Sequence, residues 1–173
     1  VDLPPVRPYE DYIGWLMAQD ESRAEAYWRA ELAGLVAPTS IVIDRADPKP
    51  SLANCWCEER LSPGETAALQ RFAREHELTM STLVHAAWVI VQARYNGGGE
   101  VVAGMTMSGR PATLPGAEYM VGLFINTLPV RVEVDEASDL ITWLQQLQEH
   151  TARAREFDYT PLTKIHEWSE VPG

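Results

Sequence analysis

The chain has 173 residues, and its 14 Lys and Arg against 25 Asp and Glu give a formal net charge of −11. This acidic balance argues against nucleic acid and anionic membranes as partners, because both are bound through clusters of Lys and Arg. With 46% hydrophobic and 23% charged residues, the composition is typical of a globular domain and excludes a disordered chain.

Neither a membrane span nor a leader peptide is predicted. No apolar run approaches the ~18 residues that cross a bilayer, and the opening Val-Asp-Leu-Pro-Pro lacks the basic and apolar regions of a signal peptide. Because the chain begins with Val, we interpret it as a piece of a longer polypeptide, with an engineered or processed start as the alternative. Cys55 and Cys57 are too close for an easy disulfide, so free thiols in a cytoplasmic protein are expected.

The first part of the chain is predicted to be helical. Apolar residues at helical spacing predict one helix over 9–16 and a second over 21–32. The proline-containing residues 36–54 are interpreted as loop. Short strands are considered at 41–43 and 56–61.

Two further helices are predicted next. Ser62-Pro63-Gly64-Glu65 is a capping box with proline at the first helical position, and apolar spacing continues this helix to His76. A longer helix begins near residue 79 or 81 and ends at Tyr95, before three glycines. It is apolar on nearly every side, which predicts burial against a sheet.

Two strands and two helices complete the chain. Val101–Ser108 is predicted to be a strand, and alternation predicts a longer strand over Val121–Val134. A long helix is predicted over 139–157, and Thr160-Pro161 is typical of a short helix start. This order of elements predicts an α/β fold class, arranged as a two-layer sandwich.

Common catalytic patterns are absent from the sequence. Its four histidines include no pair at i+3 or i+4, so no metal ligands are predicted. There is no Gly-x-Ser-x-Gly nucleophile elbow. The three glycines at 97–99 lack the Lys-Ser/Thr that a phosphate loop requires.

The strand pattern singles out Asn126. By alternation it shares a face with Phe124 and Leu128, where an unpaired amide would cost about 1–3 kcal/mol. Two roles are open: a structural tie to a neighbouring loop, or a residue that shapes a cleft. Pro129 cannot donate a ladder hydrogen bond, so the strand is an edge or contains a bulge, which would shift the later alternation. Arg110 is either a surface charge or a loop anchor.

Three segments carry a family resemblance. Residues 108–111, Ser-Gly-Arg-Pro, and 120–131, Met-Val-Gly-Leu-Phe-Ile-Asn-Thr-Leu-Pro-Val-Arg, resemble the late motif block of nonribosomal peptide synthetase condensation domains. Residues 8–15 resemble that family's Tyr-x-Asp-Tyr-x-x-Trp motif, and 157–162 resemble its following segment. The resemblance covers essentially the whole chain in the family's order, and the Gly-Leu-Phe-Ile-Asn-Thr-Leu form is similar to the ordinary condensing branch.

One departure from the family decides what the chain can do. The catalytic signature His-His-x-x-x-Asp-Gly precedes the Tyr-x-Asp motif in the family, whereas this chain starts at that motif and has no adjacent histidines. The resemblance therefore implies that residues 1–173 are part of a condensation domain. They would form the C-terminal, acceptor-side lobe of a chloramphenicol acetyltransferase-like fold, without the signature lobe and the last strands. No catalytic residue is assigned, and the isolated chain is expected to be inactive.

The resemblance also implies a reaction and partners. The complete domain, part of a multifunctional enzyme of antibiotic and secondary metabolism, would join a donor thioester to an acceptor amine. Both substrates would be carried on the phosphopantetheine arms of peptidyl carrier proteins, and no cofactor would bind the chain directly. Expected partners are the missing N-terminal lobe, the carrier proteins and an adjacent adenylation domain.

Six residues are expected to line the substrate tunnel by their motif positions. The Ser108 hydroxyl is expected to bond an acceptor group, while Arg110 and Asn126 hold the wall. The full set is Ser108, Gly109, Arg110, Gly122, Asn126 and Thr127. A non-catalytic lobe that docks a carrier protein or adenylation domain, and a coenzyme A-dependent acyltransferase lobe, are the alternatives. The Ser-Gly-Arg-Pro and Gly-Leu-Phe-Ile-Asn-Thr motifs disfavour the latter.

A half-domain should expose the apolar surface that its partner lobe would cover. Some of the six tryptophans, such as Trp15 or Trp28, are expected to be unusually exposed. A patch of this kind would favour self-association.

Overall fold

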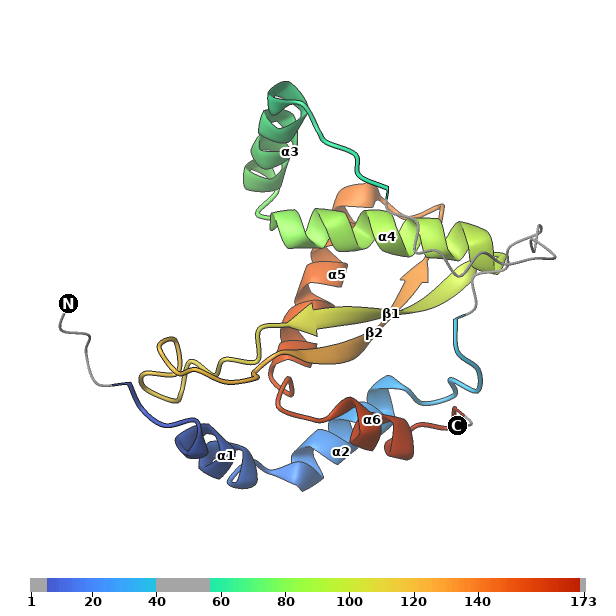
Figure 1. Cartoon of the computed structure of the whole chain (residues 1–173). Helices are drawn as coiled ribbons and strands as arrows, with labels where there is room; N and C mark the ends of the chain where they lie inside the picture. The colour runs from blue at the N-terminus through green and yellow to red at the C-terminus, as the bar shows by residue number, and fades with distance from the viewer. Residues whose placement is uncertain (1–5, 40–56, 172–173) are drawn as a thin grey trace, which may run out of the picture. The chain divides into compact units, whose positions relative to one another are not determined.

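The computed structural model describes residues 6–39 and 57–171 (Figure 1). Helices and strands both occur within these ranges, four helices preceding two strands and two helices following them, which confirms the expected α/β class. In chain order the elements are α1 (Glu10–Met17), α2 (Glu21–Glu31), α3 (Pro63–Glu75), α4 (Met80–Asn96), β1 (Gly99–Met107), β2 (Asn126–Val134), α5 (Leu140–Arg155) and α6 (Leu162–Trp168). The short strand considered at 41–43 lies outside the described residues, and 57–61 contains no strand.

Local sequence accounts for where the helices begin and end. Asp20 accepts a hydrogen bond from the Arg23 amide at the start of α2, and Ser62 and Glu65 form the predicted capping box of α3. Thr79 caps α4, and Gly97 ends it with a φ of 86°, a conformation that glycine adopts readily. Caps of this kind each contribute about 1 kcal/mol to helix stability.

β1 and β2 pair as a two-stranded sheet whose arrows point in opposite directions (Figure 1). Alternate residues are buried in each strand, and the alternation of β2 continues past Pro129, so no bulge shifts it. The buried strand residues are Val101, Ala103, Met105, Met107, Leu128, Val130 and Val132. β2 begins at Asn126, so the strand predicted from Val121 is too long at its start.

The chain divides into two compact units. The first contains the described residues of Val1–Pro38, Val102–Arg131 and Thr151–Gly173, and the second those of Thr39–Val101 and Val132–His150. The core of the first unit includes a cluster of Tyr12, Leu114, Ala117, Met120 and Phe124. In the second unit, α3 contacts α4.

One face of α4 is buried and the opposite face is exposed. The buried face consists of Thr82, Ala86, Val89, Gln92 and Ala93. The other face exposes Val84, Trp88, Val91 and Tyr95 by 43–63%. Helix α4 is therefore buried on one face only, although its sequence is apolar on nearly every side. An apolar composition allows any face of a helix to be buried. The face that is actually buried is the one that contacts other elements.

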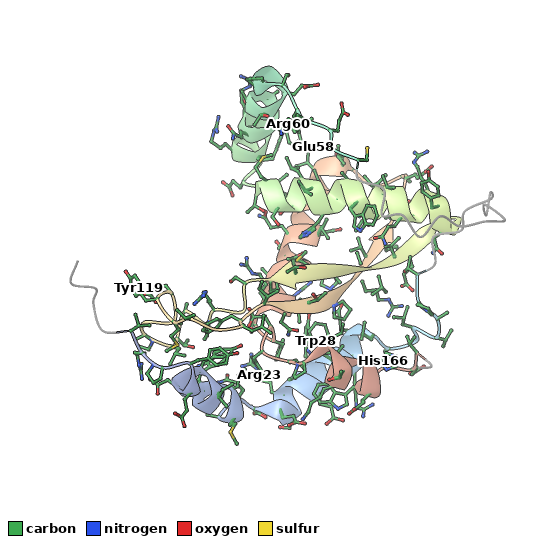
Figure 2. All side chains as sticks on the ribbon, viewed as in Figure 1. Arg23, Trp28, Glu58, Arg60, Tyr119 and His166 are labelled. Atoms are coloured by element: carbon green, nitrogen blue, oxygen red, sulfur yellow. The ribbon has the colours of Figure 1, made fainter. Side chains whose placement is uncertain are left out.

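The two tryptophans named as examples are not exposed, whereas Trp88 on α4 is. Trp28 on α2 is 0% exposed (Figure 2), and Trp15 is half-buried and donates from Nε1 to the Thr113 hydroxyl at 3.2 Å. The large exposed residues of the first unit instead include Tyr119, on the loop between the strands (Figure 2), and its alternate neighbours in the same loop. No helix within residues 6–39 and 57–171 is both long and apolar enough to cross a membrane.

Candidate functional site

A pocket of about 390 Å³ opens in the first unit where the chain leaves β1. Its lining combines the end of β1 with the segment just before β2. The lining residues are Thr106, Met107, Ser108, Arg110, Gly122, Leu123, Phe124 and Ile125. The fold thus brings Ser108, Arg110 and Gly122 of the predicted set together, whereas Asn126 and Thr127 do not belong to this lining.

Gly109 is buried next to this pocket and has no room for a side chain. Its φ is 62°, and a Cβ atom placed on it would lie 1.7 Å from the carbonyl oxygen of Phe124. A left-handed backbone and so close an approach both require glycine. Gly109 therefore lets the turn after Ser108 close directly onto the opposite segment of the pocket.

Arg110 anchors the loop that follows. Its Nη1 atom donates to the carbonyl oxygens of Ala117 and Met120, the latter at 3.1 Å. The guanidinium carbon lies 4.1 Å from the centre of the Phe124 ring, a cation–π distance. Of the two roles considered for Arg110, the contacts are those of an anchor, and its charge is held against the loop rather than offered to the pocket.

Two residues that precede helix α1, Arg7 and Tyr9, contact the same loop. The Tyr9 hydroxyl donates to the Leu123 carbonyl oxygen, and a Cβ atom on Gly122 would lie 2.1 Å from the Tyr9 ring. Arg7 donates to the Pro115 carbonyl oxygen at 3.1 Å. The Tyr-x-Asp-Tyr-x-x-Trp segment and the late motif block are therefore packed against one another.

Two roles were open for Asn126, and its contacts are those of a structural tie to another segment. Its Nδ2 donates to the carbonyl oxygens of Asp158 and Thr160, both at 2.7 Å. Its Oδ1 accepts from the backbone amide of half-buried Thr127 at 2.9 Å. These three bonds hold the start of β2 to the segment that precedes α6.

Burial raises the pKa of two ionisable groups near this core, Tyr12 and Asp158. Burial, followed by the charges of Tyr9 and Asp158, raises the pKa of Tyr12. Burial also raises the pKa of Asp158, opposed by the charge of Arg155. Tyr12 therefore stays protonated at neutral pH and packs its ring 4.5 Å from that of Phe124.

Two hydroxyls remain for a ligand. Thr106 and Ser108 are exposed, and neither side chain has a hydrogen-bond partner among the residues the structure describes. No histidine lines the pocket, and residues 6–39 and 57–171 contain no cluster of metal-ligating side chains. The pocket can thus bind and orient a ligand but holds no base. Sequence reasoning missed Thr106, although alternation along β1 places it on the face of Ser108.

A larger pocket of about 830 Å³ lies in the second unit, between α4 and the chain after β2. Its charged groups are already engaged. Arg94 pairs with Glu136 at 3.8 Å, and Asp135 accepts from the Ala137 amide and the Ser138 hydroxyl. It contains none of the predicted site residues.

Comparison with known proteins places these motifs in one family. The condensation domain model matches residues 1–173. One of the linear gramicidin synthase proteins of Brevibacillus parabrevis is 47% identical over 175 residues, which cover 99% of this chain and 3% of that protein. Chondramide synthase of Chondromyces crocatus is 42% identical over 170 residues, which cover 98% of this chain and 4% of that protein. This chain therefore spans only a small part of these curated relatives.

Solved structures have the same fold. The X-domain in its complex with OxyB from teicoplanin biosynthesis has a TM-score of 0.78 and 29% identity, covering 99% of this chain and 40% of that chain. The first condensation domain of the CDA synthetase has a TM-score of 0.74 and 19% identity, covering 93% of this chain and 36% of that chain, and is similar in fold alone. This agrees with the expected chloramphenicol acetyltransferase-like architecture. With a family model that spans its whole length and relatives of this similarity, the chain belongs to the condensation domain family.

Proposed function

We propose that this chain forms the acceptor-side wall of a condensation site, in a complete domain that makes a peptide bond between two carrier-bound substrates. The observation that supports this is the pocket itself. The family motifs converge on it, its Ser108 hydroxyl has no partner among the described residues, and Arg110 fixes its rim to the main chain.

The chemistry would be divided between this chain and the rest of the domain. The acceptor amine attacks the donor thioester carbonyl, a C–N bond forms, and the C–S bond breaks so that the thiol leaves with a proton. The imidazole that positions or deprotonates the amine belongs to the His-His-x-x-x-Asp-Gly signature, which this sequence lacks. This chain would orient the acceptor substrate, and orientation of this kind gives a large rate increase when two bound substrates react.

The loop between the strands carries a surface suited to the remainder of the domain. Its alternate residues Tyr119, Val121, Leu123 and Ile125 are 63–85% exposed, while Met120 and Phe124 between them are buried. Four exposed apolar side chains on one segment are typical of a surface that another part of the protein covers. We assign the part of this surface outside the pocket, Tyr119 and Val121, to the lobe that carries the signature, with carrier proteins and the adenylation domain as further partners of the assembled domain.

The test uses the complete condensation domain that contains this chain, with donor and acceptor loaded on their carrier proteins and the peptide measured by mass spectrometry. Ser108→Ala is expected to lower kcat/KM for the acceptor about fivefold, the value of a neutral hydrogen bond. Ser81→Ala, an exposed serine on α4, is the matched control and should leave the rate unchanged. A wild-type domain that forms no peptide from loaded carriers would refute the function, and an unaffected Ser108→Ala would refute the role of Ser108.

A second candidate is a non-catalytic docking lobe. It is favoured by the X-domain neighbour, whose structure is a complex with OxyB. In that case the complete protein would bind its partner with a measurable Kd but would form no peptide, and its signature histidines would be replaced.

A further inference from the structure

We infer that Thr106 is a specificity-determining residue of the pocket, and that it selects acceptors whose thiol arm carries an amide group. This inference rests on the proposed function, because it names the kind of acceptor that the same pocket accepts.

Few polar side chains line the pocket. Arg110 is occupied by two main-chain carbonyls and the Phe124 ring. Among the side chains that line the pocket, this leaves the hydroxyls of Thr106 and Ser108, which have no partner within the described ranges. A hydroxyl both donates and accepts, so each can bond a carbonyl oxygen or an amide N–H.

The spacing of the two hydroxyls defines what would fit. Thr106 and Ser108 both lie on the exposed side of the β1 strand and its continuation, while Met105 and Met107 face the core. Alternate residues of a strand are roughly 6.7 Å apart along its axis. The exposed Leu123 and Ile125 supply apolar surface beside them. The pocket therefore suits an apolar chain with two hydrogen-bonding groups at about that separation.

An aminoacyl thioester of a cysteamine-type thiol has this pattern. Its thioester carbonyl and its first amide are separated by the sulfur and two methylenes, which span roughly 6 Å when extended, given ordinary bond lengths. With the aminoacyl group at Ser108, the amide of the arm reaches Thr106. The pocket would thus bind the amide of the thiol arm as well as the aminoacyl group.

The test compares two soluble probes on the complete condensation domain. One is an aminoacyl N-acetylcysteamine thioester, and the other is the matching n-pentyl thioester, which has the same length but no amide. Inhibition constants are measured for each against the carrier-bound acceptor, so that a poor substrate still reports its binding. The variants are Thr106→Val, which removes the hydroxyl at nearly constant volume, and Thr106→Ser, which keeps it.

Thr106→Val is expected to weaken the N-acetylcysteamine thioester about fivefold and to leave the n-pentyl thioester within twofold, whereas Thr106→Ser restores wild-type values. Thr106→Ala is a second hydroxyl-free variant, and melting temperatures verify that each variant is folded. Equal effects on both probes, or no effect on either, would overturn the role of Thr106. Peptide formation by the wild-type domain from loaded carriers is measured alongside. Its failure would overturn the proposed function, and a flat Thr106 comparison in an active domain would overturn this inference alone.

Discussion

The loop between the strands and helix α3 contrast in how they are held. Residues 108–125 contain no helix or strand, yet Met120 and Phe124 within them are 2% and 4% exposed. Helix α3 has a complete capping box and thirteen regular residues, of which Ala73 alone is buried among its described positions. Regular backbone comes from local hydrogen bonds, whereas a fixed position comes from packing. The irregular loop is therefore the better supported of the two regions.

The bonds that hold each region also differ in kind. Arg7, Tyr9 and Arg110 hold the loop by donating to its main-chain carbonyls. Helix α3 is held at its start by Ser62 and Glu65, which bond each other's backbone amides. The first arrangement joins segments distant in sequence, and the second stays within one turn. Substitutions in the loop should therefore cost more than equivalent ones in α3.

The same change, glycine to alanine, should have opposite effects in the two regions. Gly109→Ala places a methyl group against the Phe124 carbonyl in a left-handed backbone, at an expected cost of about 2–5 kcal/mol from backbone strain and overpacking. Gly64→Ala in α3 meets only an ordinary van der Waals contact, Ser62 Oγ at 3.9 Å, and should stabilise by about 0.5–1 kcal/mol. Urea denaturation of the complete domain measures both. Similar values for the two variants would break the comparison.

A smaller effect is expected when arginine is changed to lysine. Arg110→Lys keeps the charge but cannot reproduce the planar contact with Phe124 and both carbonyl bonds, so it should cost about 1–3 kcal/mol. Arg60→Lys, just before α3, alters an 85% exposed side chain paired with Glu58 (Figure 2) and should change stability by at most about 0.5 kcal/mol. If both variants unfold at the wild-type denaturant midpoint, Arg110 does not anchor the loop.

The smallest expected effect is the contribution of His85, on α4, to the pH dependence of stability. Burial lowers the pKa of His85 on α4 from its ordinary value of 6.5, so the unfolded chain takes up a proton at higher pH than the folded one. Stability associated with His85 is therefore full above pH 6.5 and is lost as pH falls through the lowered pKa. His85→Gln should lose less stability than wild type when chemical denaturation is compared at about pH 7.5 and about pH 5.5. A parallel decline in both proteins would exclude His85 as the source.

Local signals in the sequence predicted the helices well. Ser62 and Glu65 determine the start of α3, and Thr79 and Gly97 delimit α4; each depends on residues within one turn. The family motifs likewise predicted that Ser108, Arg110 and Gly122 would meet. Their predicted role in a substrate tunnel stays a prediction.

Contacts between distant segments could not be predicted from such local signals. Val121 to Ile125 are apolar enough to suggest a strand, but they lie in a loop where Phe124 alone among them is buried, so β2 begins later than predicted. The expected exposure of Trp28 was wrong: its side chain is fully buried on α2, a helix that contacts α6, and helical spacing does not reveal which elements a helix will contact. The Asn126 bonds to Asp158 and Thr160 were an open alternative, since alternation reveals a buried amide but not its partners.

The bonds of Asn126 have a consequence for recombining synthetases. Both acceptors are main-chain oxygens, which every parent sequence supplies, so a chimaera joined between β2 and α6 keeps this tie if it retains Asn126, whatever side chains it inherits at 158 and 160. The Tyr9 ring against Gly122 depends on the identity of both residues. Crossovers that exchange the first helix without the late motif block should be placed only where both parents have this aromatic–glycine pair.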